Sequence, residues 1–243
     1  EIGVRLVGSE MCIRDRYYAD QAARKDSKLT ALARLRLAYG IQVEDPETLL
    51  SALEQLEKNH AISQVSYKKY LNLAYRLRLK GIANSEKLDA FIKSLPESVM
   101  QDKKMVVEIS ERYLSLQNDE ALANWILQVY PKGKNSALLK LLVQSFPKLG
   151  EKQQKKTLRT LESWLKENSD DTDLLEVLGI LTFNAQLWGK ARFYLEKEVA
   201  LSPRLNSLVL LSRLLYSAGE EDKAKEAAEA AFSLAECGGG EER

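Results

Sequence analysis

The 243-residue chain is 45% hydrophobic and 29% charged, which suits a folded protein with a buried core and argues against an intrinsically disordered one. Only 12 glycines and 5 prolines interrupt a sequence rich in helix-forming residues, so the composition favours an all-α fold. The formal net charge of +1 gives no basic excess of the kind that proteins use to neutralise nucleic-acid phosphates, and we expect no nucleic-acid partner.

The first segment, residues 1–16, shows no helical periodicity, and its second half resembles the translation product of a sequencing adapter. We expect this segment to be non-native or disordered, and the native N-terminus before Tyr17 to be missing. No stretch of the chain approaches the roughly 18 to 20 consecutive apolar residues of a membrane-spanning helix. Cys12 and Cys237 lie near opposite ends and form no metal-ligand or redox spacing.

Residues 17–150 contain amphipathic segments of helical length separated by residues that begin or end helices. Asp45 before a proline, Ser85 and Asn118 are each placed to cap the start of a helix, and Pro131 marks a helix boundary. The small residues that a repeat needs recur here only at approximate spacing. The sequence therefore predicts a run of degenerate helical repeats in this region.

Residues 151–236 carry a more regular pattern, that of tetratricopeptide helix-turn-helix units. Gly179 offers a first helix a surface without a side chain, and we expect Ala191 of the second helix to be the small residue opposite it. The same positions recur 33 residues later, close to the tetratricopeptide length of about 34 residues. The residues predicted to pack the repeats together are Leu178, Gly179, Trp188, Ala191, Leu211 and Ala224.

Helices of this length that are joined by short turns pack mainly on their neighbours in the sequence. The predicted fold is therefore an all-α, right-handed solenoid of tetratricopeptide-like helix-turn-helix repeats. Residues 237–243, which include three consecutive glycines, are predicted to form a flexible tail.

The first helix of each repeat has a second face, opposite the packing face, which lines the concave groove of a tetratricopeptide array. Its mixed apolar and polar side chains suit a peptide or a helix of a partner protein. The alternative is that Phe183 and Tyr216 pack between adjacent repeats, and both interpretations fit the sequence. The predicted groove residues are Asp173, Glu176, Ile180, Phe183, Asn184, Asn206, Val209, Arg213 and Tyr216.

Charge is distributed unevenly along the chain. Residues 132–166 hold nine lysines and arginines against two glutamates, a net charge of +7, whereas residues 219–243 hold three basic and eight acidic residues, a net charge of −5. The basic block forms either a solvated helix face or a surface for an acidic partner or an anionic lipid. The lysines concerned are Lys148, Lys152, Lys155 and Lys156.

The chain offers little for catalysis, since it has one histidine and no recognisable grouping of a nucleophile with a base, of metal ligands or of paired acids. We therefore expect no enzyme activity, no catalytic residue and no metal site. His60 lies where a helix is expected to end, and a histidine there commonly interacts with the negative end of the helix dipole. The alternative is a heme iron ligand at His60, with Met100, Met105 or a tyrosine beside the porphyrin.

Three stretches carry a resemblance to a known family: residues 162–165, residues 174–179, and the Leu-Trp-Gly-Lys-Ala-Arg run at 187–192 with the Tyr-Leu-Glu that follows it. They resemble the C-terminal repeats of HemY proteins, over about residues 157–236. The resemblance implies a tetratricopeptide protein of the bacterial inner membrane that supports late heme (porphyrin) biosynthesis. It also implies membrane association through hydrophobic N-terminal helices, which this chain lacks, with the repeats outside the membrane.

The sequence thus predicts a non-catalytic scaffold for protein–protein interaction, and the resemblance implies heme-biosynthesis enzymes as its partners. A carrier that binds heme or porphyrin directly is one alternative. A peptide-binding adaptor unrelated to heme is the other.

Overall fold

The computed structural model describes residues 30–238. The predicted non-native or disordered segment 1–16 and residues 239–243 of the predicted tail lie outside this range. The described residues form α-helices and one short 3-10 helix, with no β-strand among them. They divide into two units, Glu1–Ile109 and Ser110–Arg243, and helix α7 (Lys103–Ser115) contains the division.

The first unit is a series of helices in which α2, α3 and α4 pack on one another in chain order. Leu49, Leu53 and Leu56 lie on one face of α3 and are buried between its neighbours. Arg76 of α4 forms an ion pair with Glu108 of α7. The complete helices of this unit are α2 (Thr30–Gln42), α3 (Pro46–Lys58), α4 (Gln64–Lys80), α5 (Ser85–Ser94) and α6 (Glu97–Met100).

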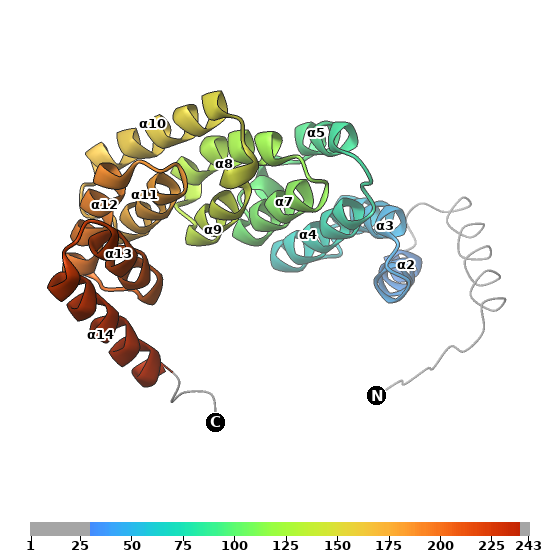
Figure 1. Cartoon of the computed structure of the whole chain (residues 1–243). Coiled ribbons are helices and arrows are strands. Elements are labelled where there is room, and N and C mark those ends of the chain that lie inside the picture. The colour runs from blue at the N-terminus through green and yellow to red at the C-terminus, as the bar shows by residue number, and fades with distance from the viewer. Residues whose placement is uncertain (1–29, 239–243) are drawn as a thin grey trace. The chain divides into compact units, whose positions relative to one another are not determined.

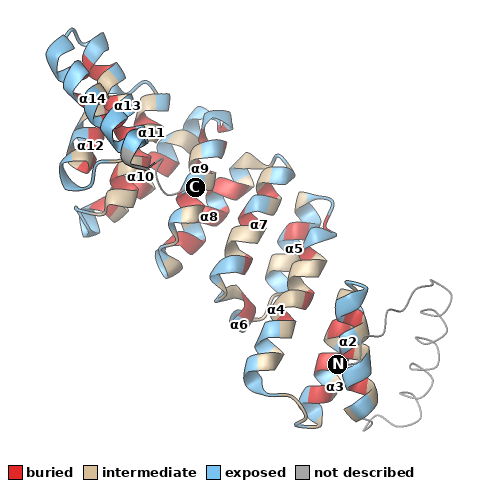
Figure 2. Ribbon diagram, turned by 90° about the horizontal axis from the view of Figure 1, so that it is seen from below, coloured by how far each residue is buried: buried red, intermediate tan, exposed pale blue. Residues whose placement is uncertain are grey.

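The second unit ends in two helix hairpins, α11 with α12 and α13 with α14, and α12 packs on α13 (Figure 1). Buried residues lie on the sides of these helices that face one another (Figure 2). The predicted all-α fold of tetratricopeptide-like helix pairs is therefore confirmed. The elements are α8 (Asp119–Gly133), α9 (Ser136–Ser145), the 3-10 helix η1 (Phe146–Lys148), α10 (Glu151–Glu167), α11 (Thr172–Asn184), α12 (Trp188–Leu201), α13 (Leu205–Ser217) and α14 (Glu221–Gly238).

The predicted change from degenerate to regular repeats after residue 150 falls inside this second unit, directly before α10, and stays a prediction. Helix α14 continues to Gly238, so the first two residues of the predicted tail are helical. Within the described residues, no helix combines the length and the apolar character that a membrane crossing would need.

Capping side chains account for several helix starts. The Asp45 carboxylate accepts a hydrogen bond from the Glu47 amide of α3, and the Asn118 side chain accepts one from the Ala121 amide of α8. The prediction that Ser85 caps α5 was wrong by one residue. Asn84 is the cap, because its side-chain oxygen accepts a hydrogen bond of 2.8 Å from the Lys87 amide.

Pro131 does not end a helix as predicted, because α8 runs on to Gly133. A proline inside a helix removes one hydrogen bond to residue i−4, and at Pro131 this loss falls in the last turn of α8. The helix ends two residues later, where Lys134 adopts a left-handed backbone conformation with φ of 42°. Gly219, in the turn between α13 and α14, has φ of 79°, a region that glycine occupies without strain.

Candidate partner-binding site

Helices α11 and α12 approach each other closely at Gly179, where no side chain separates them. A Cβ atom on Gly179 would lie 2.6 Å from Cδ2 and 2.8 Å from Cγ of Leu195. The residue opposite Gly179 is therefore Leu195 and not the predicted Ala191, although Ala191 is also buried. The other buried members of the predicted packing set are Leu178, Leu211 and Ala224.

Trp188 differs from the predicted packing role, because it is 49% exposed. It is the first residue of α12, and its ring meets the ring of Phe183 edge-on at a centroid distance of 5.4 Å. Phe183 in turn packs against the buried cluster formed by α12, α13 and α14. The packing interpretation therefore describes Phe183, whereas Tyr216 is 69% exposed and lies outside the core.

An arginine beside the α13–α14 hairpin covers part of the groove that was predicted on α11. Arg204, directly before α13, forms ion pairs with Glu176 and, at 2.6 Å, with Asp173. It also donates a hydrogen bond to the Thr172 hydroxyl, and its Nε atom lies 3.5 Å from the carboxylate of Glu198. The two predicted groove acids therefore share one ion-pair partner within the chain itself.

Glu198 is fully buried beside this arginine. Burial raises the pKa of the Glu198 carboxyl above its ordinary value, while Ser207 and the charge of Arg204 act in the opposite direction. Such a group makes the stability of the fold depend on pH.

We expect the substitution Glu198→Gln to remove a pH dependence of stability in the acid range. Because its pKa is raised in the folded state, Glu198 binds more protons in the folded than in the unfolded protein above its ordinary pKa of 4.5 and up to the raised value. The free energy of unfolding of the wild type therefore falls as pH rises through this window. Urea unfolding of both proteins across a pH series measures the effect, and parallel curves would contradict it.

The remaining predicted groove residues differ in exposure. Ile180 is half-buried on α11, and Asn184 is exposed at its end. The four predicted residues on α13 are exposed, namely Asn206, Val209, Arg213 and Tyr216.

A hollow of about 310 Å³ between α13 and α14 contains two of these residues, Val209 and Arg213. The sequence reasoning missed the half of its lining that α14 supplies, including Phe232, which is 70% exposed. The repeat length was the signal that could have found it, since seven of the eight lining residues lie 33 residues after a residue of the α11–α12 hairpin. The full lining is Leu205, Val209, Ser212, Arg213, Ala228, Ala231, Phe232 and Ala235.

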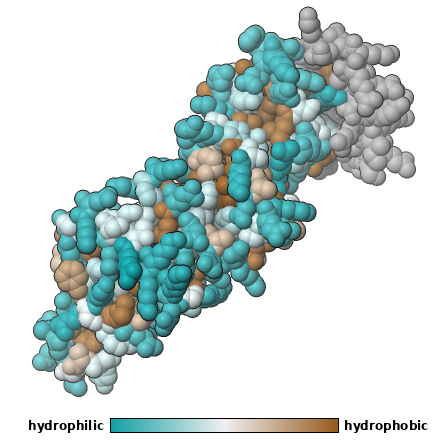
Figure 3. All heavy atoms as spheres, turned by 90° about the horizontal axis from the view of Figure 1, so that it is seen from above, coloured by the Kyte–Doolittle hydropathy of each residue, from teal (hydrophilic) through white to brown (hydrophobic). Residues whose placement is uncertain are grey.

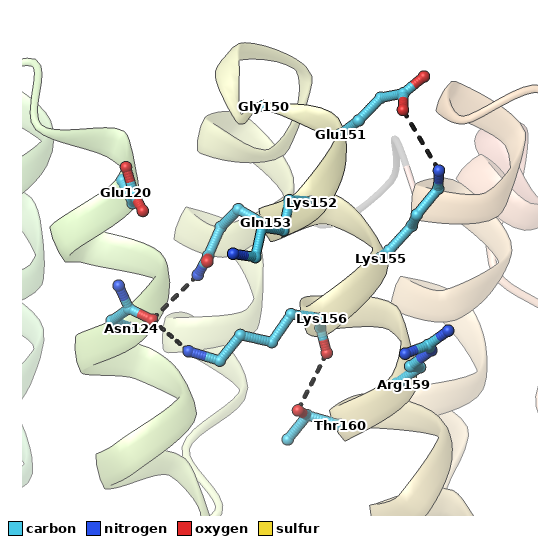
Figure 4. A pocket seen from close by; sticks show the side chains of 10 residues that line it. All are labelled: Glu120, Asn124, Gly150, Glu151, Lys152, Gln153, Lys155, Lys156, Arg159 and Thr160. Carbon is cyan, nitrogen blue, oxygen red and sulfur yellow. Dashed lines mark hydrogen bonds and ion pairs between the residues drawn. The ribbon is translucent and has the colours of Figure 1, made fainter.

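A second and more polar hollow, of about 970 Å³, lies between α8 and α10 (Figure 4). The Asn124 side-chain oxygen accepts hydrogen bonds from Gln153 at 3.0 Å and from Lys156 at 2.9 Å. Of the predicted lysines, Lys155 pairs with Glu151 at 3.2 Å, and Lys148 lies 3.8 Å from Asp119. Hydrophilic side chains cover most of the face shown in Figure 3, which views the molecule from the side where α10 lies in Figure 1.

His60, Met100 and Met105, which were considered for heme, line neither hollow. His60 is exposed just after α3 and has φ of 51°, so it takes part in ending that helix. Met105 is fully buried in α7, and Met100 is half-buried at the end of α6. Among the described residues, no three His, Cys, Asp or Glu side chains are grouped in a way that could hold a metal ion.

No family model matches the chain, and no curated protein matches it. Among solved structures, it is similar to MamA from residue 41 to its end, of Desulfovibrio magneticus RS-1, with 16% identity over 87% of this chain and 97% of that one and a TM-score of 0.43. The MamA RS-1 ArsTM double mutant is similar with 15% identity over 87% and 96% of the two chains and a TM-score of 0.43. The yeast Sti1 TPR2AB domain in complex with pHSP90 is similar with 12% identity over 83% and 90% and a TM-score of 0.30.

Proposed function

We propose that the chain is a non-catalytic scaffold that binds a helix of a partner protein in the hollow between α13 and α14. The observation that carries this proposal is the apolar, accessible lining of that hollow. Phe232 and Val209 are 70% and 36% exposed, and three alanines of α14 line the hollow with them. Exposed apolar surface of this kind, bordered by polar groups, is typical of protein interaction sites.

The preceding repeat indicates the shape of the partner. The α11–α12 hairpin, which holds most of the residues 33 positions earlier, packs against α13. Arg204, directly before α13, forms an ion pair with Glu176 of that hairpin, and its Nε atom lies 3.5 Å from the carboxylate of Glu198. The α13–α14 surface is equivalent by the repeat to the surface of that hairpin and so has the form that receives a helix.

The chemistry of the partner follows from the lining. The alanines of α14 leave room for bulky apolar side chains, which would contact Phe232 and Val209. Arg213 is exposed at the edge and suits an acidic side chain of the partner. The expected partner segment is therefore an amphipathic helix with an apolar stripe and an acid beside it.

The resemblance of residues 162–196 to HemY repeats supports a more specific assignment. We propose late heme-biosynthesis enzymes of the bacterial inner membrane as the partners, held near one another by the repeats. In this role the scaffold supplies positions for enzymes and no chemistry of its own.

The double substitution Val209→Glu and Phe232→Glu is expected to weaken partner binding at least about tenfold, because it places two charges in the apolar contact. The measurement is recovery of late heme-pathway enzymes from bacterial membrane extracts on the immobilised full chain, quantified by mass spectrometry. Recovery with the wild type and its loss with the variant are the expected results.

A control of the same chemistry replaces two exposed apolar residues of the first unit, Leu35→Glu and Val65→Glu, which are 64% and 80% exposed in the wild type. This control should bind as the wild type does. If the groove variant loses proteins unrelated to heme, the chain is a general adaptor. If no bound protein depends on Val209 and Phe232, the proposed site is wrong.

A further inference from the structure

One side of α10 carries a row of cations, here called the basic stripe. Successive members are four, three and seven residues apart, which places them on one face of the helix. All are exposed, and none forms an ion pair with another residue in the described part of the chain. The basic stripe consists of Lys152, Lys156, Arg159 and Lys166, with Ser163 between the last two.

One side of α14 carries the opposite charge in the same pattern, here called the acidic stripe. Its members are again four, three and seven residues apart, and all are exposed. The Glu229 carboxylate has Lys225 at 3.9 Å, a long distance for an ion pair. The acidic stripe consists of Asp222, Glu226, Glu229 and Glu236, with Ser233 between the last two.

The two stripes correspond position by position. Each acid lies 70 residues after a cation, and Ser233 lies 70 residues after Ser163. Both stripes extend over the same length of helix, about 21 Å at 1.5 Å per residue. When two such helices lie parallel, each cation comes opposite an acid and the two serines come opposite each other. All four charged pairs therefore attract, and no two like charges within the stripes face each other.

Within one chain the stripes do not meet. Helix α10 packs on α8 and α11, and α14 packs on α13. Helices α11, α12 and α13 separate α10 from α14 (Figures 1 and 2). The complementary surfaces are therefore available to another molecule.

We propose that a second copy of this chain binds here, with the acidic stripe of one copy against the basic stripe of another. The hollow beside α10 is lined by Lys152, Lys156 and Arg159 and has room for carboxylate side chains (Figure 4). Because the two surfaces differ, the contact joins copies head to tail. Phe232 lies three residues after Glu229 and four before Glu236, so the acidic stripe borders the proposed partner groove on α14.

Sedimentation velocity of the full chain tests the proposal. In about 0.05 M salt the wild type should associate with rising concentration, and in about 0.5 M salt the association should weaken about tenfold or more, because ions screen exposed charges. Two charge-reversed variants should each remain monomeric at low salt. They are K152E/K156E/R159E on α10 and D222K/E226K/E229K on α14.

Mixing the two reversed variants should restore association, because each then meets a partner of opposite charge. The control K68E/K87E/K93E reverses three exposed lysines of the first unit and should associate as the wild type does. Circular dichroism confirms that each variant is helical. A wild type that stays monomeric at low salt, reversed variants that associate like the wild type, or a mixture that stays monomeric would each overturn the proposal.

Discussion

Replacing Gly179 by alanine is expected to lower the free energy of unfolding by about 1–3 kcal/mol, the usual cost of overpacking a core. The added Cβ would lie 2.6 and 2.8 Å from two carbons of Leu195. Leu195 is fully buried, so its side chain has no open space to move into. The loss should appear although alanine is the better helix former by about 1 kcal/mol. Urea unfolding of wild type and variant measures it.

Gly189 supplies the matched control, since it also lies in a helix but has nothing within 4 Å of a Cβ position. Gly189→Ala should raise the free energy of unfolding by up to about 1 kcal/mol through helix propensity alone. In a Leu195→Ala background the cost of Gly179→Ala should largely disappear, because the clashing atoms are gone. Equal effects of the two glycine substitutions would show that α11 and α12 are not in close contact at Gly179.

The helix pairs could be predicted because their signals are local. Gly179 and the recurrence at 33 residues identified where two helices approach, and Asp45 and Asn118 marked helix starts correctly. The residue opposite Gly179 was misassigned. Ala191 and Leu195 lie one turn apart on the same face of α12, and only the relative shift of the two helices decides which one faces the glycine.

The groove was harder to predict because its properties depend on contacts between repeats. The sequence predicts that Asp173 and Glu176 of α11 are acids available to a partner protein. In the structure Arg204, directly before α13, pairs with both. One signal was present: Glu198 stands where the repeat expects a small apolar residue, and a buried acid there requires a cation nearby. Arg192 and Arg204 are both close in the sequence, so the pattern alone does not say which one supplies it.

The half of the hollow formed by α14 was missed for a related reason. The prediction assumed a groove lined only by the first helix of each repeat, and it therefore considered one face of α11 and one face of α13. In the structure Phe232 and Ala228 of α14 line the hollow together with Val209 and Arg213. A helix that binds between two helices contacts both of them, so a pattern read along one helix identifies at most one wall.

The substitution Arg204→Ala is expected to lower the free energy of unfolding by about 3 kcal/mol, because it leaves the fully buried Glu198 without a nearby cation. Arg204 pairs with Asp173 and Glu176 and is the cation nearest to the fully buried Glu198. Without it, three carboxylates remain together, one of them out of contact with water. Thermal and urea unfolding at neutral pH measure the loss.

Arg192 is the control, because its side chain is 34% exposed, close to the 32% of Arg204, and it also pairs with two glutamates. The partners of Arg192 are Glu196 and Glu220, whose side chains are 47% and 31% exposed and therefore remain hydrated when the arginine is removed. Arg192→Ala should have a much smaller effect than Arg204→Ala.

Adding Glu198→Gln to Arg204→Ala should restore much of the lost stability, because the buried charge is then gone. If the two arginine variants lost the same stability, or if Glu198→Gln gave no recovery, the burial of Glu198 would not be the reason that the second repeat depends on Arg204.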